Sequence, residues 1–218
     1  MNKKEILDAL NFRYACKEFD KNKKIDAENL NIILESGRLS PSSIGIEPWK
    51  FLVVTNEKLK EALLPVCPGG KKQIPSCSHL IILLNRTPKD LKSDSNYLKE
   101  LFSKDKEFPD ELANNMLRAI KIVNENRYGG SSEKMNGYSR EQVYLALGTM
   151  LATSSLLGID SCAIGGFDSE ALTKILVDNN LLDTEHFNVC CMLALGYRNE
   201  EAPIKTRRNF KDVVQFVE

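Results

Sequence analysis

The sequence has no excess of charge, no long apolar run and few metal-binding side chains. Its 218 residues carry 30 Lys and Arg against 30 Asp and Glu, so the formal net charge is zero. General nucleic-acid binding depends on neutralising phosphates, and a neutral chain is a poor candidate for it. No apolar run approaches the roughly 20 residues that cross a bilayer, so we expect no membrane span.

The sequence also argues against a metal site and against a secretory signal. The six cysteines include no Cys-x-x-Cys pair, and the two histidines, His79 and His186, lie far apart in the sequence. A zinc site needs clustered ligands, so we expect no metal centre. The first residues lead into an amphipathic pattern that contains acids, unlike the uninterrupted apolar stretch of a secretory signal. We therefore expect a cytoplasmic protein with reduced cysteines.

The composition of the chain indicates one globular domain over residues 1–218. Hydrophobic residues make up 42% and charged residues 28%, and there is no internal repeat or linker. Apolar spacing and turn residues predict alternating helices and strands, which argues for an α/β or α+β fold. Helices are expected at 2–12, 26–37, 57–64, 139–157 and 169–177, and strands at 51–55, 80–84, 159–164 and 189–195.

The strongest predicted helix follows Ser139-Arg140-Glu141-Gln142, which has the pattern of a capping box. Residues 139–157 are apolar on all sides, which is typical of a helix buried in a core or at a subunit interface. Before it, residues 87–137 form a polar helical excursion. Such an insertion either covers an active site or is a solvated helical hairpin without a role.

Five short segments carry the chemistry that the sequence offers. Arg13 and Lys17 place two cations four residues apart, and residues 205–208 place three cations within four residues, which suits a phosphate. Each of these is also an ordinary basic surface. Pro41-Ser42-Ser43 offers hydroxyl groups in a turn, although serine-rich turns are common.

The last two segments are rich in glycine. Gly165-Gly166 follows a predicted strand, where a flat ligand can approach the backbone. Gly69-Gly70-Lys71-Lys72 is glycine-rich and basic but is not a P-loop, and no Gly-x-Gly-x-x-Gly dinucleotide pattern occurs in the chain.

In their order along the chain, these segments resemble the NAD(P)H-dependent, FMN-binding nitroreductase family. The resemblance runs from Arg13-Tyr14-Ala15-Cys16-Lys17, through Pro-Ser-Ser ahead of Pro48-Trp49, to Lys205-Thr206-Arg207. It includes residues 141–148, which are similar to the family's central dimer helix. It implies an α+β sandwich with a mainly antiparallel sheet flanked by helices, and an interlaced homodimer whose tail, residues 197–218, reaches the partner subunit.

The resemblance also implies where FMN binds. Arg13, Lys205 and Arg207 match positions that hold the phosphate, and Lys17 matches the residue facing the pyrimidine edge of the flavin. Pro41, Ser42 and Ser43 match the loop lent by the partner subunit, while Gly165 and Gly166 face flavin N5. The same matching adds Tyr14, Ala15, Gly45, Gln73 and Ile164 to the expected cofactor-binding residues.

Some residues depart from the family pattern, which is usually Pro-Ser-Ser-x-Asn-x-Gln-Pro-Trp. Here Gly45 removes an amide and Glu47 places a carboxylate where an amide is usual. Many relatives have Glu-Gly in place of Gly165-Gly166. Glu47 is therefore a possible pocket residue that bears on substrate choice. Cys162, three residues before Gly165, is a second possible pocket residue, although alternation along the strand favours core packing for it.

The implied chemistry is a ping-pong transfer of hydride from NAD(P)H through FMN to a small electrophilic acceptor, a nitroaromatic or a quinone. The flavin carries the reaction and the protein supplies position and charge, so no side-chain proton donor or acceptor is expected. Three alternatives stay open. They are a flavin reductase or another FMN enzyme on the same scaffold, a non-enzymatic flavin-binding redox sensor using Cys162 or Cys16, and a dimeric interaction protein without flavin.

Overall fold

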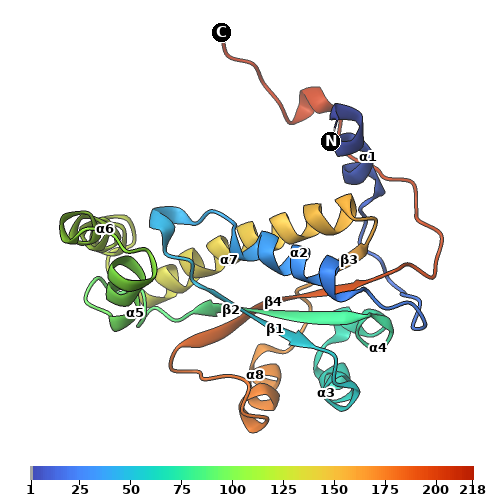
Figure 1. The fold of residues 1–218 in the computed structure, drawn as a ribbon, viewed down its shortest axis with the longest axis horizontal. Helices are drawn as coiled ribbons and strands as arrows, with labels where there is room; N and C mark the ends of the chain where they lie inside the picture. Colours follow the sequence, from blue (N-terminus) through green and yellow to red (C-terminus); the bar gives the residue numbers. More distant parts are fainter. Residues whose placement is uncertain (1) are drawn as a thin grey trace.

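A four-stranded antiparallel sheet forms the centre of the computed structural model, which describes residues 2–218 (Figure 1). The strand order is β1-β2-β4-β3, with every neighbouring pair antiparallel. The bounds are Trp49–Val54 for β1, His79–Arg86 for β2, Asp160–Ile164 for β3 and Phe187–Gly196 for β4. The predicted α+β fold with a mainly antiparallel sheet is confirmed, and each predicted strand boundary lies within two residues of the observed one.

The two central strands, β2 and β4, are buried on both faces, as their continuous apolar runs predict. A bulge interrupts their pairing, because Leu83 pairs with Cys191 whereas Leu84 pairs with Val189. The extra residue is Cys190, which packs in the same core as Cys191 instead of on the opposite face. Both residues are about 1% exposed, so they are part of the packed core.

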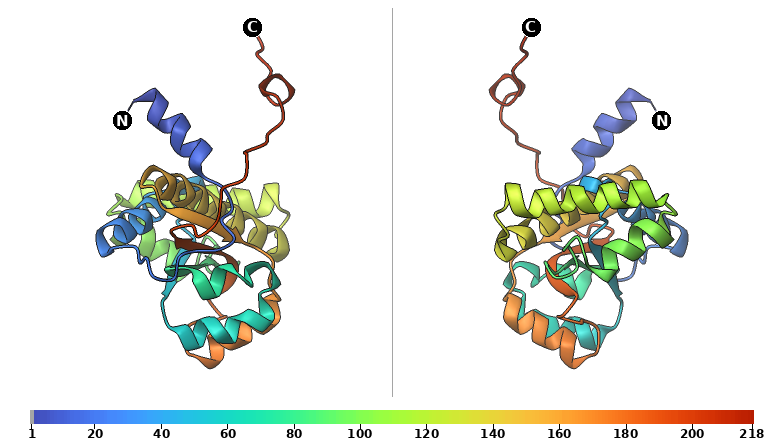
Figure 2. Two further views of the ribbon diagram at one scale, coloured as in Figure 1. Left: turned by 90° about the vertical axis from the view of Figure 1, so that its right-hand side faces the viewer. Right: turned by 90° about the vertical axis from the view of Figure 1, so that its left-hand side faces the viewer.

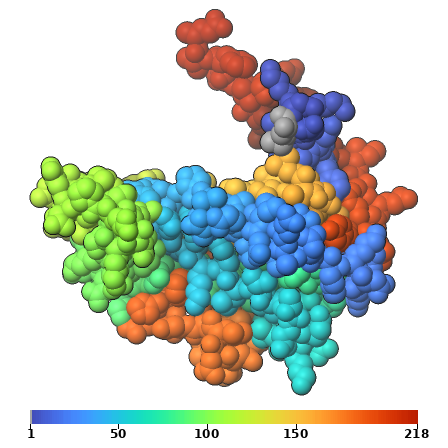
Figure 3. Space-filling view, viewed as in Figure 1, coloured from blue at the N-terminus to red at the C-terminus, as the bar shows by residue number. Residues whose placement is uncertain are grey.

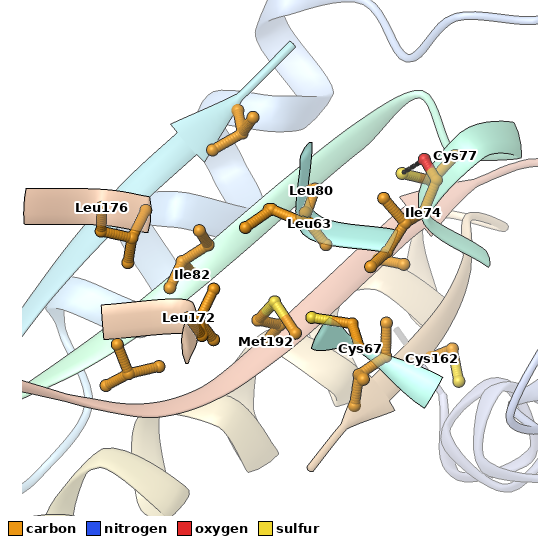
Figure 4. Packing of buried hydrophobic residues seen from close by; sticks show 14 of the residues in the cluster. Leu63, Cys67, Ile74, Cys77, Leu80, Ile82, Cys162, Leu172, Leu176 and Met192 are labelled. Atoms are coloured by element: carbon orange, nitrogen blue, oxygen red, sulfur yellow. Dashed lines mark hydrogen bonds between the residues drawn. The ribbon is translucent and has the colours of Figure 1, made fainter. Parts of the chain in front are cut away.

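Helices cover both faces of the sheet (Figures 1 and 2). On one face lie α2 (Ala27–Arg38) and α7 (Ser132–Leu156). On the other lie α3 (Glu57–Leu63), α4 (Gln73–Ser76) and α8 (Ser169–Asp178). In this second layer Leu63, Leu172 and Leu176 pack against Ile82 and Met192 of the sheet (Figure 4).

The start of α7 corrects the prediction of a capping box at residues 139–142. The helix begins at Ser132, and its N-cap is Ser131, whose hydroxyl oxygen accepts the N–H of Lys134. Ser139 lies inside the helix, where its hydroxyl is buried and donates to the carbonyl of Arg86. A serine that bonds to a neighbouring strand thus has the same sequence signature as a serine that caps a helix.

The glycine predicted to end the second helix also has a different role. Gly37 lies inside α2, which extends to Arg38. A Cβ at this position would lie 2.2 Å from Cε of Met150 on α7. Gly37 is therefore required for the close contact between the two helices rather than for a C-terminal turn.

The polar excursion is helical, but it ends at residue 131, because residues 132–137 belong to α7. It contains α5 (Asn96–Glu100), a π-helical turn η4 (Leu101–Asp105), α6 (Asp110–Ile122) and a second π-helical turn η5 (Val123–Arg127). These elements pack around their own apolar core against the first turns of α7. They form the lobe at one end of the molecule (Figures 1 and 3).

The first and last segments of the described chain stand out from the body of the molecule. The first helix, α1 (Lys3–Phe12), and the tail after β4 extend away from the body (Figures 1, 2 and 3). The tail exposes large apolar side chains, including Phe216 at 78% and Val217 at 89%. Over residues 2–218 we find no helix with the length and apolarity of a membrane span, and no cluster of three side chains suited to a metal ion.

Candidate functional site

The residues singled out by the sequence form two groups that lie toward different parts of α7. The first group lies around β3 and the start of the tail. The second is the loop 41–47, where the N–H of Ser43 donates to Oε1 of Gln142 at 2.8 Å. Helix α1, which leads into the first group, packs beside Ser155 instead. An α-helix rises 1.5 Å per residue, so these two points on α7 are about 20 Å apart, and one chain does not bring the groups together.

In the first group, residues 13–17 run as an extended segment beside β3. Ala15 forms a parallel bridge with Ser161, and the N–H of Cys16 donates to the carbonyl of Ser161 at 3.2 Å. Glu200 of the tail holds the other side of the segment. Its Oε1 accepts the N–H of Lys17 at 2.6 Å and the hydroxyl of Tyr14 at 3.1 Å.

These contacts fix the protonation of the groups involved. Burial raises the pKa of the Tyr14 phenol, and Cys16 and Glu200 raise it further, so the phenol stays protonated. Burial opposes ionisation of Glu200, but the N–H of Lys17 and the Tyr14 hydroxyl lower the pKa of its carboxyl group. Glu200 is therefore an anion that fixes the backbone of the site, a role that the sequence did not predict.

A second unpredicted contact joins the tail to β3. The guanidinium Nε of Arg198 donates to Oδ1 of Asp160 at 2.8 Å, and the backbone N–H of Arg198 donates to Oδ2 at 2.9 Å. The guanidinium also lies over the rings of Phe12 and Tyr14, 4.1 and 4.8 Å from their centroids. Asp160 is 4% exposed. The sequence indicated this pair only through an acidic residue near the start of one apolar strand and a basic residue just after the end of another.

Three cations of the first group gather without an acidic partner. The ammonium group of Lys205 donates to the carbonyl oxygen of Arg13. Burial lowers the pKa of Lys205, and the charges of Arg13 and Arg207 lower it further, which places the three cations within range of one another. Within residues 2–218, no carboxylate forms an ion pair with any of them. Cations placed together in this way form a site for an anion.

Gln73 and Cys162 meet beneath this cluster. Both are buried, and Nε2 of Gln73 donates to Sγ of Cys162 at 3.8 Å. Burial raises the pKa of Cys162, although Lys17 and the bond from Gln73 oppose the shift. The thiol is therefore neutral and is poorly suited to act as a nucleophile.

The glycine turn after β3 is held against a second glycine loop. The N–H of Gly69, in the turn η3 (Pro68–Gly70), donates to the carbonyl of Gly166 at 2.8 Å. A Cβ at Gly69 would lie 2.9 Å from that oxygen. Gly165 is exposed, with nothing within 4 Å of the Cβ position, while Ile164 is buried. The Gly69-Gly70 pair thus supports the Gly165-Gly166 turn instead of forming a separate site.

The second group, the loop 41–47, lies between α7 and the helical excursion. The Ser42 hydroxyl oxygen accepts the N–H of Glu47 at 2.9 Å, and the carboxylate of Glu47 pairs with Lys106 of the excursion. Gly45 and two non-glycine residues of the loop have positive φ. Pro41 and Ser43 are exposed. The hydroxyl groups that the sequence indicated are therefore presented at a surface, without the cations of the first group beside them.

Comparison with known proteins gives a consistent result. The model of the nitroreductase family matches residues 10–197. The Bacillus subtilis (strain 168) protein named "Putative NAD(P)H nitroreductase YfkO" is 40% identical over 217 residues, covering 99% of this chain and 98% of its own length.

Solved structures are similar over nearly the whole chain as well. One is a "putative NAD(P)H:FMN oxidoreductase" from Staphylococcus epidermidis, with a TM-score of 0.80 at 23% identity over 97% of this chain and 95% of that one. Another is a "putative nitroreductase in complex with FMN" from Exiguobacterium sibiricum, with a TM-score of 0.75 at 18% identity over 97% of each chain. At these identities the two structures support the fold alone.

Proposed function

This chain belongs to the nitroreductase family, and from that premise we propose that it is an NAD(P)H-dependent oxidoreductase that uses FMN to reduce nitroaromatics, quinones or related electrophiles. The observation that carries the proposal is the group of cations at Arg13, Lys205 and Arg207. Lys205 contacts the backbone of Arg13 and feels the charges of Arg13 and Arg207, and within residues 2–218 none of the three pairs with a carboxylate, so an anion such as a phosphate would bind favourably here. The residues present therefore fit the phosphate of FMN.

The other residues of the first group would bind and orient the ring system. When bound, FMN would supply hydride acceptance and donation. Lys17 brings a cation to the segment next to β3, where it stabilises negative charge on a ligand. The exposed Gly165-Gly166 turn leaves room for a flat ring against the backbone, because no side chain occupies that space. No side chain is assigned a proton-transfer role.

We further propose that the site is completed by a second copy of the chain. The points where the loop 41–47 and α1 meet α7 are about 20 Å apart along that helix, which supports a loop that serves the site of a partner. The sheet has an open edge, because among the described residues β1 pairs with β2 alone. Beside that edge an apolar groove of about 1210 Å³ runs between α2 and β1 and includes Leu39 and Phe51. The apolar tail of a second copy would cover this groove.

The alternative of a thiol-based redox sensor is less favoured by the side chains. Burial raises the pKa of Cys16 to about 12, and burial also raises the pKa of Cys162. Redox-sensing thiols are exposed and readily ionised, which neither group is. The flavin reductase alternative differs only in its acceptor.

The proposal is tested by the absorption spectrum of the purified protein and by turnover. We expect a yellow protein from which denaturation releases FMN, and which oxidises NADH or NADPH only when a nitroaromatic or quinone acceptor is present. Comparing these acceptors with free flavin separates the proposed activity from flavin reduction. A colourless protein that takes up no FMN would contradict the proposal.

The burial of Cys162 leads to a separate prediction. Because its sulfur packs in the core beneath the cations, Cys162→Ala should lower the free energy of unfolding by about 1–2 kcal/mol. The value of kcat/KM for a nitro compound, normalised to bound FMN, should change by less than about twofold. A change of about fivefold or more in the normalised value would instead assign Cys162 a direct contact with ligand.

A further inference from the structure

The backbone of the loop 41–47 is left-handed at three of seven residues. Ile44 has φ 59°, Gly45 has φ 67° and Glu47 has φ 41°. L-residues other than glycine rarely adopt this region, and such conformations persist only where the surroundings enforce them. The contacts that hold the loop in this conformation therefore indicate which groups it exposes to a ligand.

Contacts with the helical excursion hold most of the loop in this conformation. The hydroxyl of Tyr97 on α5 lies 2.7 Å from the carbonyl oxygen of Ile46 and 2.8 Å from that of Glu47, and donates to this pair. Burial raises the pKa of Tyr97 to about 12, so the phenol keeps the proton that it donates. The side chain of Ile46 is fully buried in the core of the excursion. The loop is thus fixed to α5 and η4 and does not move independently of them.

Lys106, directly after η4, brings a cation to the same loop. Its side chain crosses Gly45, with Cε 3.7 Å and Nζ 3.8 Å from the position that a Cβ would take. The ammonium group pairs with the carboxylate of Glu47. The side chains of Lys106 and Glu47 are 22% and 33% exposed, so the pair lies at the surface of the loop but is partly shielded from water.

Within residues 2–218, no cation besides Lys106 forms an ion pair with Glu47. Arg38 is close enough to feel its charge, but the guanidinium of Arg38 is bound to Glu35 by two hydrogen bonds of 2.8 and 2.5 Å. Without Lys106, the loop would therefore present an unpaired carboxylate. With it, the loop presents a neutral pair whose ammonium group has further N–H donors for a ligand oxygen.

We propose that the Glu47–Lys106 pair, carried by one copy of the chain, sets the charge selectivity of the ligand site in the second copy. This inference rests on the proposed function, because the loop 41–47 reaches a ligand only if two copies share the site. An unpaired carboxylate there would repel anionic ligands, including the phosphates of NAD(P)H and acceptors that carry a carboxylate. Lys106 cancels that repulsion, so that anionic and neutral acceptors are both admitted.

The test compares two acceptors that differ mainly in charge, p-nitrobenzoate and p-nitrobenzyl alcohol. Their dissociation constants are measured on the oxidised, FMN-loaded protein from the change in the flavin spectrum, without turnover. The ratio of kcat/KM for the two compounds is measured separately. The variants are Lys106→Met, Glu47→Gln and the double substitution. Lys104→Met is the matched control, because Lys104 lies on η4, is 76% exposed and pairs only loosely with Glu100, at 3.8 Å.

We expect Lys106→Met to weaken the binding of p-nitrobenzoate, relative to that of the alcohol, by about tenfold. This is the size of effect expected from an unpaired charge several ångströms away at a partly exposed site. Glu47→Gln should shift the ratio in the opposite direction, and the double variant should return it close to the wild-type value. Lys104→Met should leave the ratio unchanged. Opposite signs in the two single variants cannot come from general loosening of the loop, which would affect both compounds alike.

Equal shifts for both compounds, or shifts of the same sign in both single variants, would overturn the inference while leaving the proposed function intact. Glu47→Gln keeps the test valid if Lys106→Met alone folds poorly, because a shift toward p-nitrobenzoate is expected in that variant by itself. A wild-type protein that takes up no FMN would overturn the proposed function and this inference together.

Discussion

Replacement of Arg207 by Ala should weaken FMN binding by about 1.5–3 kcal/mol, the range for a hydrogen bond to a charged group. Arg207 lies beside Lys205 and Arg13 and has no acidic partner within residues 2–218, so the lost interaction is with the ligand. Since the interaction is between charges at a partly exposed site, the affinity of the wild-type protein should also fall as the salt concentration rises.

The measurement is a titration of the apoprotein with FMN, followed by flavin fluorescence. Arg208→Ala is the matched control, because Arg208 is the next exposed cation in the same tail and forms no ion pair in the described chain. It should change FMN affinity by less than about 0.5 kcal/mol, as is usual for surface substitutions. Equal losses in the two variants would show that the tail contributes only its overall charge, and no loss in either would reject the phosphate assignment.

Replacement of Asp160 by Ala should lower the free energy of unfolding by about 3 kcal/mol. The substitution removes two hydrogen bonds and an ion-pair contact of Arg198, and it leaves the guanidinium without a counter-ion. Breaking a buried pair costs about 3–5 kcal/mol, and the lower end applies because the Arg198 side chain is 24% exposed and can reach water. FMN affinity should fall as well, because the pair joins the tail to β3 and Phe12.

Denaturant unfolding at one protein concentration measures this effect, since a dimer would make the apparent stability depend on concentration. Lys174→Ala serves as the control. Lys174 pairs with Asp178 at 2.7 Å on the surface of α8, with both side chains more than half exposed. Such a pair contributes about 0–1 kcal/mol. A loss of less than about 1 kcal/mol in Asp160→Ala would mean that the Asp160–Arg198 pair does not anchor the tail.

The sequence predicts the strands and most helices well because their signals are local. Apolar runs such as 80–84 can be buried only in the middle of a sheet, and Asp168 caps α8 as its position indicates, accepting the N–H groups of Glu170 and Ala171. The errors occur where a residue bonds outside its own segment. Ser139 bonds to a strand and Gly37 admits Met150, and neither contact leaves a trace in the periodicity of its helix.

The residues of the candidate site likewise fall into those with a local sequence signal and those that act through contacts distant in sequence. Residue type and the family resemblance single out the cations Arg13, Lys205 and Arg207, and their role in binding a phosphate stays a prediction. Glu200 and Lys106 were missed because each acts through a contact between segments far apart in sequence, Glu200 with Lys17 and Lys106 with Glu47. A carboxylate that fixes a backbone and a lysine that neutralises a loop look like ordinary surface charges until the fold places them.

The claim that two copies of the chain share each site is tested most directly by mixing two defective variants. Arg13→Ala/Lys205→Ala removes two of the cations, and Ser43→Pro removes the N–H that Gln142 holds in the loop 41–47. Each variant alone should form dimers and bind little FMN. After the two are unfolded and refolded together, a heterodimer has one site with intact cations from one chain and an intact loop from the other. Random pairing then restores about one quarter of the FMN sites. A mixture in which native mass spectrometry detects heterodimers but FMN binding stays at the level of the separate variants would contradict the account.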